Sequence, residues 1–238
     1  MLESSHDKEM LASWIKEANS MVVLTGAGIS TESGIPDFRS KNGLYQKQNA
    51  FYRSILENEY DRFHGFCKDL FGKYGDSQPN AAHEILAKWE DESYVSAVIT
   101  QNIDGLHQKA GSRNVLELHG TMDKASCMDC GKPSLARYFY EKIGCQYCGG
   151  RLRPDIVLFG DQLPEDILKR SFQYCQEADL VLVIGSSLIV SPACDLPFLS
   201  RGKKVLINKD EVGKKNMFDL LLYGSAGEIL KDVDNFIE

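Results

Sequence analysis

The sequence predicts an α/β fold, a doubly wound parallel sheet interrupted by a small metal-binding insert. Short apolar strand patterns alternate with helical patterns along most of the chain, which is typical of strands joined by crossover helices. Several strand patterns end in small or polar residues, as the ligand-binding strand ends of open parallel sheets do. Two Cys-x-x-Cys pairs lie close together between two strand patterns, which indicates an insert organised by a metal ion.

The composition favours a cytoplasmic globular protein. The chain has 238 residues, of which 43% are hydrophobic, enough for one sizeable domain and a small insert. Its net charge of −7 argues against a general nucleic-acid-binding protein, which needs a basic surface to neutralise phosphates. No apolar run approaches the ~20 residues of a membrane span, and the first residues lack the basic-then-apolar order of a secretory signal. We therefore expect a cytoplasmic location without membrane contact, and nucleic acid is disfavoured as a partner.

The chain opens with an amphipathic helix over 10–18 and a buried strand over 21–25 that leads into a glycine-rich turn. Gly26 and Gly28 let the backbone turn tightly and approach a ligand, and the N–H groups of the next helix would point at a phosphate. The full dinucleotide fingerprint needs a third glycine, where this chain has Thr31, and an acid at the end of the next strand, where it has amides. An ordinary nicotinamide dehydrogenase is therefore disfavoured.

A polar loop over 33–43, broken by glycine and proline, predicts a mobile lid over the ligand site. Asp37, Phe38 and Arg39 offer an acid, an aromatic face and a phosphate-binding fork in succession. A plain solvated linker is the alternative interpretation. We expect the lid and the helical segment behind it, at about 36–78, to cover the cleft.

The most polar strand ends lie between residues 95 and 119. A β-branched run is followed there by Gln101, Asn102 and Asp104, a cluster of two amides and an acid. A second short strand pattern ends at His119. Because ligands bind outside the carboxyl ends of parallel strands, we expect these side chains to be functional. For His119 on this stretch alone, a satisfied core histidine is an equal alternative.

Four of the seven cysteines form two Cys-x-x-Cys pairs, the strongest local signal in the sequence. Cys127 and Cys130 make the first pair, and Cys145 and Cys148 follow after fourteen residues. In a reducing compartment this spacing indicates one zinc ion held by two hooks. Four thiolates leave no open coordination position for water, so the zinc is expected to be structural. The other three cysteines are expected to be small buried hydrophobic residues.

The rest of the chain continues the alternation of helices and strands. The further elements predicted are helices over 60–71 and 82–89, a strand over 156–159, a helix over 164–176, a strand over 180–184 ending in Gly185-Ser186-Ser187, a helix after Ser191-Pro192, a strand over 205–207 ending at Asn208, and a helix over 227–237.

Taken together, eight motifs along nearly the whole chain resemble those of the sirtuins, which are NAD-dependent protein lysine deacylases. No single motif is decisive, but eight in the family's order are highly specific, and the compact length is similar to that of bacterial members. The motifs are GAGIS from Gly26, GIPDFR ending at Arg39, TQNID from Thr100, LHG around His119, the paired Cys-x-x-Cys, VLFG from Val157, GSS from Gly185, and IN at Ile207.

The resemblance implies a Rossmann-like NAD-binding domain over 1–120 and 156–238, a zinc-ribbon insert over 121–155, and an acylated-lysine protein or peptide in the cleft between them. His119 would be the general base, Asn102 would act beside it, and nicotinamide would leave as the acyl group passes to ADP-ribose. Val157, Phe159 and Gly160 would contact the substrate. The residues implied to hold NAD are Gly26, Ala27, Gly28, Thr31, Asp37, Phe38, Arg39, Gln101, Asn102, Ile103, Asp104, Gly185, Ser186, Ser187 and Asn208.

The chain departs from the family pattern at a few positions. Asp161 stands where many relatives have Glu. Members that prefer succinyl or malonyl lysine carry a Tyr and an Arg where this chain has His64 and Cys67, so a neutral acyl group is favoured here. Two rival functions remain open, a mono-ADP-ribosyltransferase that uses the same NAD site and a zinc-ribbon nucleic-acid-binding module.

Overall fold

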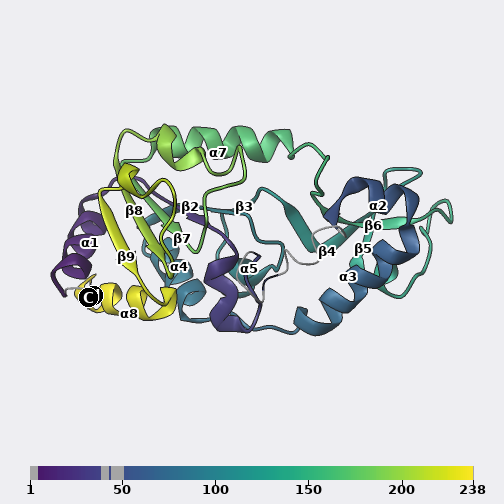
Figure 1. Cartoon of the computed structure of the whole chain (residues 1–238), viewed down its shortest axis with the longest axis horizontal. Coiled ribbons are helices and arrows are strands. Elements are labelled where there is room, and N and C mark those ends of the chain that lie inside the picture. The colour runs from purple at the N-terminus through teal and green to yellow at the C-terminus, as the bar shows by residue number, and fades with distance from the viewer. Residues whose placement is uncertain (1–4, 39–42, 44–50, 238) are drawn as a thin grey trace.

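The large sheet of the computed structural model, which describes residues 5–38, 43 and 51–237, has six parallel strands (Figure 1). Their spatial order is β3-β2-β1-β7-β8-β9, and every neighbouring pair is parallel. This is the strand order of a doubly wound dinucleotide-binding sheet, in which the order reverses between the two central strands. The predicted fold class is confirmed. The strands are β1 (Met21–Thr25), β2 (Val95–Thr100), β3 (Val115–Glu117), β7 (Leu180–Ile184), β8 (Lys203–Asn208) and β9 (Leu220–Tyr223).

Helices cover both faces of the large sheet, so its central strands β1 and β7 are buried on both sides and are apolar except for Thr25 at the end of β1. Alternate residues of β1 face opposite layers, with Val23 in one core cluster and Val22 in the other. On one face pack α1 (Ser5–Glu17), α4 (Ala81–Asp91) and α8 (Ala226–Ile237); on the other pack α7 (Glu165–Glu177) and the 3₁₀ helix η3 (Leu196–Leu199).

A second, three-stranded sheet lies beside the large one and has its own core (Figure 1). Phe63 and Cys67, which precede β2 in the chain, pack in this core with Phe139 and Leu152. Segments far apart in sequence therefore build one hydrophobic cluster. The boundaries 121–155 for the insert stay a prediction. The elements here are α2 (Arg53–Asn58), α3 (Tyr60–Tyr74), β4 (Gly120–Cys127), β5 (Pro133–Leu135), α6 (Ala136–Tyr140) and β6 (Leu152–Ile156), and the short helices η1 (Ala27–Ser33), α5 (Leu106–Lys109) and η4 (Lys215–Met217) complete the set.

Two predicted elements differ from the structure, and one strand of the large sheet was not predicted. The strand expected over 156–159 is wrong, because β6 ends at Ile156 and pairs antiparallel with β4 in the small sheet. Only Phe159 makes one further bridge, to Tyr52. The segment after Pro192 forms turns and the 3₁₀ helix η3 rather than a longer helix. The unpredicted strand is β9, which lies at the edge of the large sheet.

Part of the predicted lid, including Arg39, lies outside the described residues. Asp37 and Phe38 are described, and both line the cleft discussed below. Among the helices that are described, none combines the length and the apolar character needed to cross a membrane.

Candidate functional site

A cleft of about 950 Å³ runs along the carboxyl ends of the central strands and continues to the β4–β6 side of the molecule. Its walls include all the predicted ligand and substrate residues that the structure describes, together with His119. Sequence analysis therefore identified one contiguous site. The predicted residues that line it are Gly26, Ala27, Gly28, Thr31, Asp37, Phe38, Gln101, Asn102, Ile103, Asp104, His119, Val157, Phe159, Gly160, Gly185, Ser186, Ser187 and Asn208.

The floor of the cleft is a close contact between the loops that follow β1 and β7. The Gly28 N–H donates to the Gly185 carbonyl over 2.9 Å. A Cβ atom on Gly28 would lie 2.6 Å from Gly185 Cα, which no real side chain tolerates. Gly185 itself has a φ of +63°, the left-handed region that favours glycine. Because these positions are glycine, the backbone at the start of η1 can form the wall of the cleft. This wall lies between β1 and β7, where the strand order of the sheet reverses and a dinucleotide phosphate fits.

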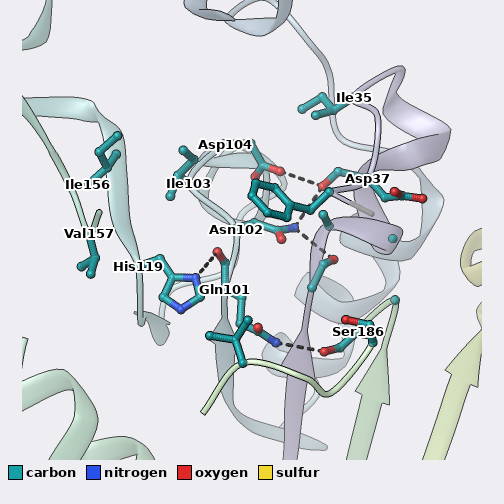
Figure 2. A pocket seen from close by; sticks show the side chains of 18 of the residues that line it. Ile35, Asp37, Gln101, Asn102, Ile103, Asp104, His119, Ile156, Val157 and Ser186 are labelled. Atoms are coloured by element: carbon teal, nitrogen blue, oxygen red, sulfur yellow. Dashed lines mark hydrogen bonds between the residues drawn. The ribbon is translucent and has the colours of Figure 1, made fainter. Parts of the chain in front are cut away.

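A buried polar cluster follows β2 and faces η1 (Figure 2). The Asn102 amide donates to the Gly26 carbonyl at 3.3 Å and to Ser30 Oγ at 3.2 Å. Ser30 Oγ in turn donates to one Asp104 oxygen at 2.7 Å, and the other accepts from the Leu106 N–H at 3.0 Å. These bonds use the Asn102 amide nitrogen, whereas Oδ1 has no hydrogen-bond partner among the described residues. An orientated amide oxygen of this kind suits an amide-bearing ligand.

His119 lies at the end of the neighbouring strand, with one ring nitrogen fixed (Figure 2). Nδ1 lies 2.9 Å from the Gln101 carbonyl, which can only accept, so Nδ1 carries the proton and Nε2 carries the lone pair. Burial lowers the pKa of His119, although the Gln101 carbonyl opposes this shift. The imidazole is therefore neutral near pH 7 and can accept a proton at Nε2. Gln101 Nε2 also donates to Ser186 Oγ at 3.0 Å and so connects the ends of β2 and β7.

Two histidines that sequence analysis did not single out lie beside this cluster. His83 on α4 and His107 on α5 are fully enclosed, and their rings meet edge to face with centroids 4.9 Å apart. Burial lowers the pKa of His83 to about 4 and that of His107 to about 3. Neither has a local sequence signal, because each is a lone histidine in an ordinary helical pattern.

We expect the free energy of unfolding to fall as the pH is lowered from 7 to 5.5. Both histidines are neutral in the folded protein and become protonated on unfolding below about pH 6.5, so the unfolded state binds more protons there. Between pH 7 and pH 5.5, the titration of each histidine should lower the free energy of unfolding by about 1 kcal/mol. Urea unfolding at several pH values measures the slope, and His107→Gln, which cannot titrate, should make it shallower. An unchanged slope in that variant would contradict the assignment for His107.

The four paired cysteines come together on the small sheet. All four Sγ atoms lie within 4.8 Å of one another, with Cys127 to Cys148 at 3.5 Å and Cys130 to Cys145 at 3.7 Å. A tetrahedron of Zn–S bonds of about 2.3 Å has edges of about 3.8 Å, so this set fits zinc. The Cys130 N–H, 3.5 Å from Cys127 Sγ, lowers the pKa of the Cys127 thiol and favours the thiolate that a metal needs.

The side of the cleft near the small sheet is formed by the loop that follows β6. The Val157 N–H donates to the His119 carbonyl at 2.8 Å, which joins this loop to the histidine. The Phe159 main chain is already paired with the segment 51–53, accepting from the Arg53 N–H at 3.0 Å. The N–H and the carbonyl of Phe159 therefore both already have a main-chain partner.

The structure shows what the three residues that depart from the family pattern contact. Asp161 accepts from Arg153 at 2.8 Å and from the Leu158 N–H at 3.1 Å, so it shapes the turn of this loop from within. His64 and Cys67 are buried in the small core, where His64 Nε2 lies 2.8 Å from the Phe139 carbonyl. Neither lines the cleft in the part of the chain that the structure describes.

Comparison with known proteins gives three consistent findings. The model of the Sir2 family matches residues 26–192. A protein of Oceanobacillus iheyensis named NAD-dependent protein deacetylase is 40% identical over 234 residues, covering 95% of this chain and 99% of that protein. A solved Sir2 complex with a p53 peptide and NAD+ superposes with a TM-score of 0.87 at 36% identity, over 95% of this chain and 96% of that one.

A second solved Sir2 structure is similarly close to this chain. Sir2 in complex with an inhibitor, 2'-O-acetyl-ADP-ribose and a deacetylated p53 peptide has a TM-score of 0.88 at 37% identity, and the match covers 97% of this chain and all of that one. Fold, cleft and four-cysteine cluster all agree with these likenesses. The chain belongs to the Sir2 family.

Proposed function

We propose that this protein is an NAD-dependent protein lysine deacetylase, or more broadly a deacylase. The observation that carries the proposal is His119, neutral and with its lone pair on Nε2, on the wall of the cleft that also contains Asn102 and the glycine loops. NAD supplies the ribose carbon from which nicotinamide leaves and the ADP-ribose that takes the acyl group. The substrates are proteins or peptides that carry an acylated lysine.

The residues of the chain divide into two groups around this chemistry. At one end of the cleft, the backbone around Gly26 and Gly28 and the hydroxyls of Ser186 and Ser187 hold the phosphates and riboses of NAD, with Asn208 further along. Thr31, Asp37, Phe38, Gly185 and Gln101 complete that wall, and Arg39, which lies outside the described residues, is proposed from the sequence as a further NAD-binding residue. Gln101 also donates to Ser186 and so links the loops that follow β2 and β7.

Closer to the reacting atoms, Asn102, Ile103 and Asp104 orientate the nicotinamide end. Asn102 Oδ1 accepts a hydrogen bond from the carboxamide, while Asp104 and Ser30 keep the amide in place. His119 Nε2 takes the proton of a ribose hydroxyl, and the Gln101 carbonyl holds Nδ1–H so that the lone pair stays on Nε2. The side chains of Val157 and Phe159 and the backbone of Gly160 guide the acyl-lysine into the cleft.

The cysteine tetrad holds one structural zinc ion and has no place in the chemical steps. A neutral acyl group is favoured, because neither His64 nor Cys67 brings a positive charge to the cleft wall. A cytoplasmic location agrees with reduced cysteines, which include three buried thiols outside the zinc set.

The proposal predicts that NAD is consumed with release of nicotinamide and is never reduced. Mass spectrometry of the products from NAD and an acetyl-lysine peptide should show bare lysine and acetyl-ADP-ribose. A peptide that gains the mass of ADP-ribose, whether or not its lysine was acetylated, would favour the mono-ADP-ribosyltransferase. Absorbance of NADH without free nicotinamide would refute both.

A further inference from the structure

Asn102 is held by a row of buried hydrogen bonds from residues that do not line the cleft. The Asn102 N–H donates to Thr100 Oγ1 at 3.1 Å. Thr25 Oγ1 donates to the same Thr100 oxygen at 2.8 Å, and His107 Nε2 lies 3.0 Å from Thr25 Oγ1. All four residues are buried, with the two threonines on adjacent strands β1 and β2. Because all four are buried, loss of one of these bonds would leave a buried polar group without a partner.

The direction of each bond follows from the number of protons available. The Thr25 hydroxyl has one proton, which it donates to Thr100, so it must accept from His107 Nε2–H. His107 is therefore the tautomer protonated at Nε2, with a lone pair on Nδ1. Thr25 Oγ1 thus accepts from His107 and donates to Thr100, and Thr100 Oγ1 accepts from both Thr25 and the Asn102 N–H.

His83 contacts the His107 ring and, through Asn80, connects it to η1, the helix whose Ser30 binds the Asn102 side chain. Its Nδ1 accepts from the Asn80 N–H at 3.3 Å, so its proton is on Nε2. The Asn80 side chain donates to the Ile29 carbonyl at 2.8 Å, directly before Ser30. His83 Nε2–H and His107 Nδ1 have no hydrogen-bond partner among the described residues, and they are a donor and an acceptor on rings in contact. The two buried rings are therefore in edge-to-face contact without a hydrogen bond between them.

We propose that His107 is a positioning residue for the reaction, and that it fixes the backbone of Asn102 through Thr25 and Thr100. Asn102 is then held at two points, its N–H by this row and its side chain by Ser30 and the Gly26 carbonyl. His107 touches neither ligand nor reacting atoms. Its effect is on the orientation of the amide that faces the nicotinamide end of the cleft, and the inference rests on the proposed function of that site.

The test measures exchange of labelled nicotinamide into NAD in the presence of an acetyl-lysine peptide, with purified full-length chain. His107→Leu removes the donor and should lower the maximal exchange rate about tenfold, as expected for one buried hydrogen bond, with the KM for peptide unchanged. His107→Gln, whose Nε2 can reach the same place, should restore most of the rate. Thr25→Val should reproduce the loss, and Thr25→Val with His107→Leu should be no slower than either alone.

The matched control is Cys175→Ala, a change at a buried position of α7 that should lower the melting temperature without lowering exchange. Equal exchange rates in wild type, His107→Leu and Thr25→Val would overturn the positioning role, and so would additive losses in the double variant. If His107→Leu fails to fold, Thr25→Val, which keeps the shape of threonine, and His107→Gln decide the question. A wild-type protein that exchanges no nicotinamide would instead refute the proposed function.

Discussion

His119→Ala is expected to abolish net deacylation while nicotinamide exchange continues. In the proposed mechanism His119 Nε2 would accept a proton from the ribose hydroxyl, a step that follows the departure of nicotinamide. Loss of a positioned base typically costs about 10²-fold or more. Exchange reports only the earlier bond cleavage and its reversal, which the residues around Asn102 control. Both rates should be measured on the same preparations with an acetyl-lysine peptide.

Asn102→Ala provides the contrast that makes this result informative. It removes the amide that faces the nicotinamide end, so exchange and deacylation should fall together. Thermal melts must show that both variants are folded, since His119 also bonds the Gln101 carbonyl. If folded His119→Ala deacylates at the wild-type rate, His119 is only a satisfied core histidine.

The parts of the site that could be predicted from sequence are those with local chemistry. Gln101, Asn102 and Asp104 directly follow a strand pattern, and His119 directly follows another, so the general rule for parallel sheets placed them together. The cysteine tetrad is also local, since two short hooks within one insert must meet if they bind one ion. Predicting these residues therefore needed no information on contacts between distant segments of the chain.

The parts that could not be predicted depend on contacts between distant segments. His107 bonds Thr25, 82 residues away, and no pattern in either segment signals that partner. The helical spacing of α3 correctly gives an apolar face with Phe63, but not its partner Phe139. The run from Ile156 to Phe159 resembles a buried strand, yet it is apolar because Ile156 and Leu158 enter the small core beside the cleft.

The shared core of the small sheet predicts that loss of zinc will unfold more than the cysteine hooks. Cys127 and Cys145 belong to the same hydrophobic cluster as Phe63 of α3 and Leu56 of α2. Structural zinc provides about 10–16 kcal/mol of apparent binding free energy in small zinc-dependent domains, and three thiolates hold the ion less well than four. Cys145→Ala should therefore loosen α2 and α3 together with β4–β6, and not the insert alone.

Hydrogen exchange measured by mass spectrometry, with zinc content determined on the same samples, tests this expectation. Wild type should contain one zinc per chain, and in Cys145→Ala peptides over 53–74 and 120–156 should lose protection together. Peptides from β1 and β7 should remain protected, because their clusters contain no residue of the small sheet. Cys175→Ala, which alters a cysteine in the large core, should keep its zinc and the protection of α3. An active wild-type protein without zinc, or a variant in which α3 stays protected while β4–β6 unfold, would contradict the coupling of metal to this shared core.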